Sequence, residues 1–353
     1  MSARRKTQRI MLANNRKLAM TASAVLKRIL ATLARIAVMG TVAFGLSVAS
    51  AQDYPSRPIK IVVPFPAGGP LDLTARLLAE KLAISFRQTL VVENRPGASG
   101  NIGTDAVAKA EPDGYTLLFV LDTPLTAHPA LYANLPFDPV RDFEPISVVA
   151  GFSLTLVVHP SVPVASVAEF ITYAKGLKDR PMLYGSGGGR GDPGHLTMEY
   201  FKQQAGFQAV HVPYKGNTEV VMGLVGGQIQ AGFLATPGVV QVAREGRLKA
   251  LATSSGLQPS FTPEVPTIAD SGYPGFEASF CMLMLTPKGI PEPIRALLER
   301  EVRQALQSPD LQARLRTQAL EPIGSTGAEA SARLKSASER WRTVIKTSNI
   351  RFD

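Results

Sequence analysis

The sequence predicts an α/β protein of two α/β lobes joined by a hinge of two chain crossings. From about Pro58 onward, short β-branched runs alternate with turns and with segments of helical periodicity, which is typical of sheets covered by helices. After removal of a leader, about 300 residues remain. This is more than a single hydrophobic core usually contains, so the length predicts two domains. The apolar run at 146–158 has the length and composition of a strand that leaves one lobe and enters the next.

Residues 1–51 have the composition of a secretory signal peptide. The first 35 residues contain nine basic side chains and no acidic one. An apolar run at 36–48 follows, and then the small residues Ala49-Ser50-Ala51, which suit a cleavage site. The run is shorter than the roughly 20 residues of a membrane-spanning helix. We therefore expect cleavage after Ala51 and export from the cytoplasm.

The net charge gives no support for a nucleic-acid partner. The whole chain carries 38 basic and 28 acidic residues, a formal charge of +10. Nine of the basic residues belong to the leader, so the exported protein is nearly neutral. The remainder contains no basic stripe with interleaved aromatic residues, and we expect no binding to nucleic acid.

The cysteine and the histidines predict no metal site. Cys281 is the only cysteine, which excludes an internal disulfide and a cysteine-rich metal site. His128, His159, His195 and His211 do not have the spacing of metal ligands. We expect neither a metal nor a cofactor. Only His195 stands out, because it ends a glycine-rich loop and opens a helix.

The first lobe is predicted from units of strand, turn and helix. In the first helix Leu71, Ala75, Leu78 and Leu82 recur at i, i+4, i+7 and i+11 on one face. We expect the sheet to be mostly parallel and covered on both faces. The predicted strands are 59–63, 90–93 and 116–120, and helices follow at 71–82, at 102–110 and after 123.

The second lobe repeats this pattern, and the chain then returns. We assign residues 52–155 and 254–353 to lobe 1 and residues 156–253 to lobe 2, with the return crossing at 249–253. Two separated segments and two crossings make a hinge. The predicted helices are 167–175, 196–205, 220–225 and 239–245, the strands are 182–184, 209–213 and 229–233, and C-terminal helices at 293–306, 311–318 and 328–345 pack back onto lobe 1.

Three glycine-rich turns follow predicted strands, where open sheets bind their ligands. The turn PFPAGGP at 64–70 leads into a helix whose first position suits Pro70, with Asp72 placed to cap the first turn. The turns GASGNIG at 97–103 and GSGGGRGDPGH at 185–195 repeat the arrangement, one in each lobe. Bare backbone amides at a helix start favour an anion, so we expect these turns to face one another across an anionic ligand.

Enzyme motifs are incomplete. The run at 189–194 matches the dinucleotide fingerprint literally, but it contains a proline. The run at 97–101 lacks the final glycine of a hydrolase nucleophile elbow. We expect no enzymatic activity, and a periplasmic serine hydrolase that uses Ser99 or Ser186 is the less favoured alternative.

Extended motifs run through nearly all of the chain after the leader. They are YPSRPIKIVVPFPAGGPLDLTARLLAEKL, VVENRPGASGNIGTDAVAKAEPDGYTLLF, HPALY, FEPIS, GSGGG, VPYKG, LVGGQIQAGF, LKALATSS, PEVPTIADSGYPGFE and KGIPEPI. With them the chain resembles the periplasmic receptors of tripartite tricarboxylate transporters, the Bug or TctC family. The resemblance implies a periplasmic-binding-protein type II fold that closes on a ligand, commonly a carboxylate held partly through water and backbone amides.

The resemblance also implies a set of ligand contacts. Where the family often has an aspartate after the phenylalanine of one strand, this chain has Leu234, which disfavours an amino acid and favours a plain or partly apolar carboxylate. The matching positions are Phe65, Ala67, Gly68, Gly69, Asp72, Ser99 and Thr123 in lobe 1, and Ser186, Gly187, Gly188, His195 and Thr236 in lobe 2.

These observations predict an extracytoplasmic solute receptor. We expect a small carboxylate to dock on the amides of Gly68 and Gly69 and on the hydroxyl of Ser99, with the loop at 186–188 closing over it. Membrane permease subunits of a tripartite tricarboxylate-type transporter are the expected partners, and the protein is expected to be a monomer in the periplasm. An orphan receptor that presents a carboxylate to a sensor protein is the alternative with the same pocket.

Overall fold

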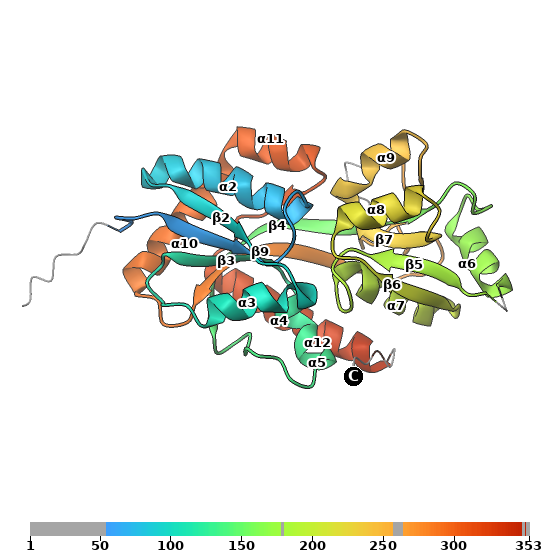
Figure 1. The fold of residues 1–353 in the computed structure, drawn as a ribbon, viewed down its shortest axis with the longest axis horizontal. Coiled ribbons are helices and arrows are strands. Elements are labelled where there is room, and N and C mark those ends of the chain that lie inside the picture. The colour runs from blue at the N-terminus through green and yellow to red at the C-terminus, as the bar shows by residue number, and fades with distance from the viewer. Residues whose placement is uncertain (1–53, 178–179, 257–263, 348–349, 351–353) are drawn as a thin grey trace, which may run out of the picture. The chain divides into compact units, whose positions relative to one another are not determined.

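The computed structural model describes residues 54–177, 180–256, 264–347 and 350 (Figure 1). The predicted signal peptide lies outside these described residues. Within them, 10 strands form one mixed sheet in the order β2-β1-β3-β9-β4-β7-β5-β6, with β8 and β10 paired to β4. None of the described helices is long and apolar enough to cross a membrane.

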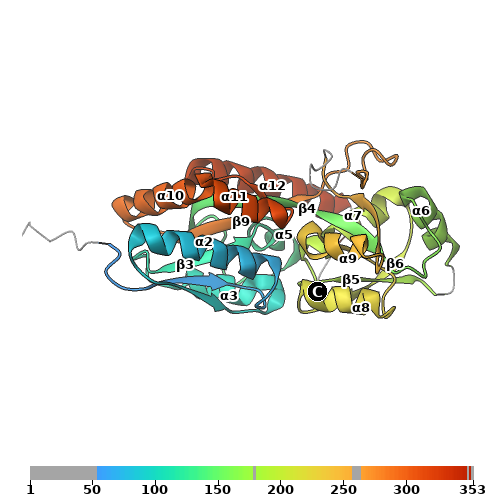
Figure 2. The same cartoon turned by 90° about the horizontal axis from the view of Figure 1, so that it is seen from above.

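Lobe 1 is built around parallel and antiparallel strands. Strand β1 (Ile59–Val63) pairs in parallel with β2 (Leu90–Asn94) and β3 (Thr116–Leu121). Strand β9 (Ser279–Pro287) pairs antiparallel with β3. Helices lie on both faces of this part of the sheet (Figures 1 and 2). They are α2 (Pro70–Phe86), α3 (Asn101–Ala108), α4 (Thr123–Thr126), α5 (His128–Leu131), α10 (Glu292–Gln307), α11 (Pro309–Thr317) and α12 (Gly327–Thr347).

Lobe 2 contains a second group of strands. Strand β5 (Met182–Ser186) pairs in parallel with β6 (Ala209–Pro213) and β7 (Ala231–Ala235). Strand β8 (Lys249–Thr253) completes the group. Its helices are α6 (Val167–Gly176), α7 (Pro193–Ala205), α8 (Asn217–Val225) and α9 (Val240–Arg244).

The long strand β4 (Phe143–Val158) belongs to both lobes. Its residues 143–153 pair antiparallel with β9. Its residues 154–158 pair antiparallel with β7, and residues 155–158 pair with β8. Short β10 (Glu321–Pro322) pairs with the middle of β4. The sheet is therefore continuous through the hinge, while the exact division of the chain into 52–155, 156–253 and 254–353 stays a prediction.

The elements form where local sequence and burial agree. Helix α2 begins with Pro70 in its first turn, and its predicted apolar stripe is buried against the sheet. Leu78 and Leu82 are each at most 1% exposed, so their burial contributes about 1.5 to 3 kcal/mol apiece. The lobe 1 core joins segments that are distant in sequence, because Leu118 of β3 and Leu283 of β9 lie in one cluster with Ala330 of α12.

One expectation about the sheet is wrong. The sheet is mixed rather than mostly parallel, because β9 inserts antiparallel between β3 and β4. We did not predict β9, since its run of methionine and leucine has neither alternation nor β-branched residues. Residues 249–253 form strand β8, which pairs with residues 155–158 of β4, and their role as the return crossing stays a prediction.

Candidate functional site

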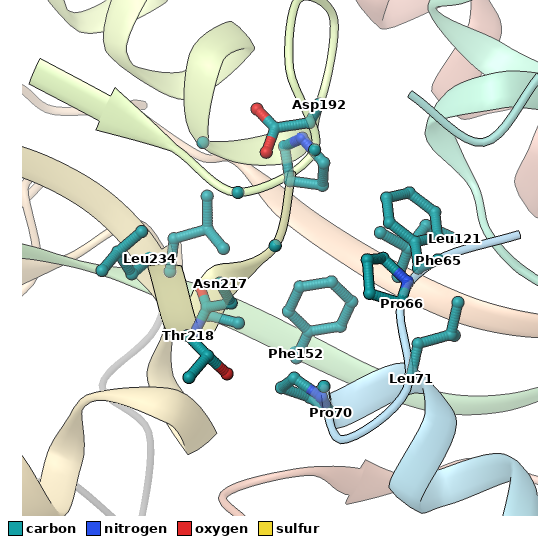
Figure 3. A pocket seen from close by; sticks show the side chains of 18 of the residues that line it. Phe65, Pro66, Pro70, Leu71, Leu121, Phe152, Asp192, Asn217, Thr218 and Leu234 are labelled. Atoms are coloured by element: carbon teal, nitrogen blue, oxygen red, sulfur yellow. The ribbon is translucent and has the colours of Figure 1, made fainter. Parts of the chain in front are cut away.

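A cavity of about 210 Å³ lies between the two lobes (Figure 3). Its size is below the roughly 300 to 1,000 Å³ of sites for drug-sized ligands, so it suits a small molecule. Lobe 1 and the shared strands provide Phe65, Pro66, Ala67, Gly69, Pro70, Leu71, Leu121, Phe152, Leu154 and Met282. Lobe 2 provides Gly187, Gly188, Asp192, Pro193, Gly194, Gly216, Asn217, Thr218, Glu219, Phe233, Leu234 and Ala235.

Three helices begin at this cavity. Helices α2, α7 and α8 start at Pro70, Pro193 and Asn217, and all three residues line it. The first N–H groups of a helix have no acceptor within the helix, and the helix dipole makes this end positive. The described lining residues include no lysine, arginine or histidine. Attraction for an anion therefore comes from backbone amides rather than from basic side chains.

The turn before α2 is held by Asp72. The backbone N–H of Gly68 donates to Asp72 Oδ2 at 2.9 Å, and Asn94 Nδ2 donates to Asp72 Oδ1 at 3.0 Å. Gly68 has a φ of +80°, which favours glycine. Burial raises the pKa of Asp72, but hydrogen bonds from Arg76, Gly68 and Asn94 outweigh burial and leave that pKa below its usual value. Asp72 is therefore ionised, and its carboxylate fixes the turn through these hydrogen bonds.

A carboxylate of the protein already occupies the start of α7. Asp192 Oδ1 accepts a hydrogen bond from the backbone N–H of His195 at 2.8 Å, which caps the helix. Burial raises the pKa of Asp192 to about 6, against the opposing effect of hydrogen bonds from His195, Ser186, Gly188 and Gly187. Because Asp192 uses these donors, fewer of them remain for a ligand at this end of the cavity.

Lobe 1 holds the glycine-rich loop of lobe 2 through the carbonyl of Arg190. Ser99 Oγ donates to Arg190 O at 2.6 Å, and the Tyr132 hydroxyl donates to the same oxygen at 3.0 Å. A Cβ atom on Gly189 would lie 3.3 Å from Ser99 Oγ, so the loop backbone approaches Ser99 closely. These contacts join lobe 1 to the loop of lobe 2 whose residues Gly187 and Gly188 line the cavity.

His128 makes a second contact between the lobes. Its Nε2 lies 3.2 Å from the carbonyl oxygen of Gly191, and its Nδ1 lies 2.6 Å from the side-chain oxygen Oδ1 of Asn101. Burial lowers the pKa of His128 to about 4, so the ring is neutral near pH 7. Both facing atoms are oxygens, which accept, and the neutral ring carries one N–H, so it donates to one of them at a time.

A network of histidine and tyrosine rings lies behind the glycine-rich loop. Ser186 Oγ lies 2.8 Å from His211 Nε2, which is the spacing of a nucleophile and a base. Ser186 is fully buried, however, and its single hydroxyl proton is shared between two acceptors, Gly189 O at 3.1 Å and the Asp192 carboxylate. His195 stacks on His211, and burial lowers the pKa of each ring to about 3. The network therefore supports the loop with neutral rings.

The family of the chain follows from a match along most of its length. The family model described as "Tripartite tricarboxylate transporter family receptor", TctC, matches residues 74–350. The chain belongs to the TctC family. Protein BugT of Bordetella pertussis is 36% identical to it over 298 residues, which cover 84% of this chain and 91% of BugT.

Solved structures of TctC-type proteins share the fold. The structure of R. palustris Rpa4515 with adipate is 33% identical, with a TM-score of 0.81, and the match covers 85% of this chain and 100% of that one. MatC from Rhodopseudomonas palustris, solved with bound malate, is 28% identical, with a TM-score of 0.78, and the match covers 83% of this chain and 100% of MatC. The α/β fold class predicted from the sequence is the fold class of these proteins.

The predicted contacts of this TctC chain fall into two groups. Phe65, Ala67, Gly69, Gly187 and Gly188 line the cavity. The other predicted positions, Gly68, Asp72, Ser99, Thr123, Ser186, His195 and Thr236, are not among its lining residues.

Two members of the second group, Thr123 and Thr236, are buried just after the ends of strands β3 and β7. Thr123 is fully buried in the first turn of α4, after the end of β3. Thr236 Oγ1 donates to Ser153 O at 2.9 Å, at the end of β7. A direct role in ligand binding stays a prediction for both groups.

Several lining residues were missed from the sequence. The start of α8 at Gly216–Glu219 had a recognisable signal, because YKGN at 214–217 is another glycine-containing turn between a strand and a helix. Phe152 and Leu154 had none, since every residue of their strand from 146 to 158 is buried. Met282 was missed together with β9.

Proposed function

We propose that this chain is an extracytoplasmic receptor that captures a small carboxylate between its two lobes. The observation that carries this function is the convergence of three helix starts on a small cavity whose described lining residues include no basic side chain. Such a cavity binds an anion through backbone amides. Relatives solved with adipate and with malate support a carboxylate as the anion.

Binding uses the donors that the protein leaves open. Asp192 takes up those at the start of α7, so the carboxylate docks on the starts of α2 and α8, at the Gly69 turn and the Gly216 turn. The first turn belongs to lobe 1 and the second to lobe 2, and a ligand that bonds to both stabilises the closed form relative to the open form. Ser99 contributes by holding Arg190 O rather than by touching the ligand.

Location and partners complete the proposal. Residues 1–51 act as a cleaved signal peptide, and the mature receptor works as a monomer in the periplasm. It delivers its ligand to permease subunits of a tripartite tricarboxylate-type transporter. It performs no covalent step, which agrees with the complete burial of Ser186 beside His211.

Calorimetry on Gly69 variants tests this function. A Cβ on Gly69 would meet Pro66 O at 3.7 Å, which is ordinary contact, so a side chain fits the fold at this position, which lines the cavity. A thermal-shift screen of mono-, di- and tricarboxylates on the wild type identifies the compound that stabilises the protein most, and this compound is the probe for calorimetry. We expect Gly69→Leu to abolish binding of that probe, while Gly176→Leu, in open space at the end of α6, retains it. Unchanged affinity of Gly69→Leu, or turnover of the probe, contradicts the proposal.

A further inference from the structure

We propose that the cavity selects a ligand with one carboxylate on an apolar aliphatic or aromatic body, and that it rejects di- and tricarboxylates. This proposal rests on the proposed function as a carboxylate receptor. It is carried by three features of the cavity: an apolar wall, one patch of open donors, and described lining residues whose only charged side chains are acidic.

The apolar wall is formed by neighbouring strands. Phe152 comes from β4 and Leu234 from β7 (Figure 3). Leu154 of β4 and Met282 of β9 also line the cavity. These four side chains are at most 6% exposed. Leu121, at the end of β3, extends the wall into lobe 1. A carboxylate placed against this wall would lose its water without gaining a hydrogen bond, whereas a hydrocarbon group gains from the contact.

The open donors form one patch rather than two. A Cβ atom on Gly216 would lie 3.8 Å from Pro66 Cγ, so the turn before α8 and the turn before α2 approach each other across the lobes. Both turns present the first N–H groups of a helix to the cavity. One carboxylate, with two oxygens, can bridge the two turns. The start of α7 offers no equivalent place, because Asp192 caps it.

The charged side chains of the lining are Asp192 and Glu219, and both are acidic. Glu219 Oε2 accepts from the backbone N–H of Lys215 at 3.2 Å, which holds its carboxylate at the start of α8. Among the lining residues that the structure describes, there is no cation that would balance a second ligand carboxylate. That group would meet either the apolar wall or a like charge, and both lower its affinity.

Matched pairs of ligands test the proposal on the mature protein, which is the chain after removal of residues 1–51. The probes are hexanoate against adipate, and 4-methylbenzoate against terephthalate, in which a methyl group replaces the second carboxylate. We expect calorimetry at pH 7.5 to show the monocarboxylate of at least one pair binding tenfold or more tighter than its partner. If a dicarboxylate binds equally well or better in both pairs, the selectivity is wrong while the receptor function stands. If neither these probes nor any other carboxylate binds, both proposals fail.

A glutamate variant tests the electrostatic part separately. Glu219→Gln should raise dicarboxylate affinity by about threefold relative to monocarboxylate affinity, because it removes one like charge from the lining. Glu169→Gln is the matched control. Glu169 is also in the first turn of a lobe 2 helix and also accepts the backbone N–H four residues earlier, but it is not a lining residue. A dicarboxylate to monocarboxylate ratio that is the same in both variants overturns the role of Glu219.

Leu121→Ser tests the apolar part. Leu121 is only partly buried, so a smaller polar residue there is expected to leave the fold intact. It should weaken hexanoate or 4-methylbenzoate, whichever binds tighter to the wild type, by about threefold or more, because apolar contact is lost. Adipate and terephthalate affinities should change less. An equal loss for both members of a pair contradicts an apolar subsite at this position.

Discussion

The hydroxyl of Ser99 in lobe 1 donates a hydrogen bond to the backbone carbonyl of Arg190 in lobe 2 at a distance of 2.6 Å. Ser99 lies in the left-handed region, with a φ of 54°, which is unfavourable for a residue with a Cβ atom. The fold thus places a strained residue where its side chain reaches the opposite lobe. The same bond joins lobe 1 to the glycine-rich loop that contributes Gly187 and Gly188 to the cavity.

Replacement of Ser99 by alanine should weaken ligand binding. The neighbouring Ala98 has a φ of 48°, so alanine is compatible with this backbone. We expect carboxylate affinity to fall about five- to tenfold in calorimetry, because the closed form loses one hydrogen bond between the lobes. Ser85→Ala, which removes a hydroxyl bonded to Leu82 O within α2, should bind like the wild type. Equal affinities for wild type and Ser99→Ala would show that the contact does not stabilise closure.

Binding should tighten as the pH falls toward 6. Burial raises the pKa of Asp192 to about 6, so this residue takes up a proton between pH 7.5 and 5.5 while a ligand carboxylate with a pKa near 4 stays ionised. Removal of the negative charge beside the ligand should raise affinity by about threefold or more. Asp192→Asn keeps a helix-capping side chain and should give a flat profile. Asp138→Asn is the control, since backbone hydrogen bonds from Arg141 and Val140 keep the pKa of Asp138 low.

His128 should make the folded state sensitive to acid. Burial lowers its pKa to about 4, whereas the unfolded chain binds this proton near pH 6.5. The stability that neutral His128 contributes is complete above pH 6.5 and is lost as the pH falls toward 4, by about 3 kcal/mol in total. His128→Gln can still bond to Gly191 O and Asn101, and it should remove this part of the slope. Urea unfolding of both proteins between pH 7 and 4 measures the difference, and parallel curves would contradict it.

Gly187 should tolerate no side chain. A Cβ atom there would lie 2.7 Å from the backbone N and Cα of Asn217, too close without movement of the start of α8. We expect Gly187→Ala to lose ligand binding and to be destabilised by about 1 to 3 kcal/mol. Gly216→Ala is the comparison, because its Cβ would meet only Pro66 Cγ at 3.8 Å. Circular dichroism melts and calorimetry distinguish the variants, and equal behaviour of the two would refute the steric argument.

The sequence predicted those elements whose pattern is local. Helix α2 was predicted from the spacing of Leu71 and Leu78, with its first turn marked by Pro70. Strand β9 was not predicted, because it is buried on both faces and its residues carry no alternation. Its place between β3 and β4 depends on contacts with residues more than a hundred positions earlier. Pairing of this kind leaves no signal within a short window of sequence.

The candidate site shows the same division between local and distant signals. Gly69, Gly187 and Gly188 were found because a glycine-rich turn before a helix is visible in the sequence. Ser99 and His195 were singled out by the same logic, yet their side chains bind the protein itself, Ser99 through Arg190 O and His195 in the ring network. Whether a polar side chain points to a ligand or to a neighbouring loop is decided by tertiary packing.

The position of β9 also affects the order in which the protein folds. Met282 pairs with Leu121 across the sheet, and α12 covers the same core from still further along the chain. The strands of lobe 2, in contrast, all lie between residues 143 and 253. During synthesis lobe 2 has its complete set of strands first, whereas lobe 1 waits for the last quarter of the polypeptide. Contacts over such sequence distances form slowly, which lengthens the time that a newly made chain stays unfolded.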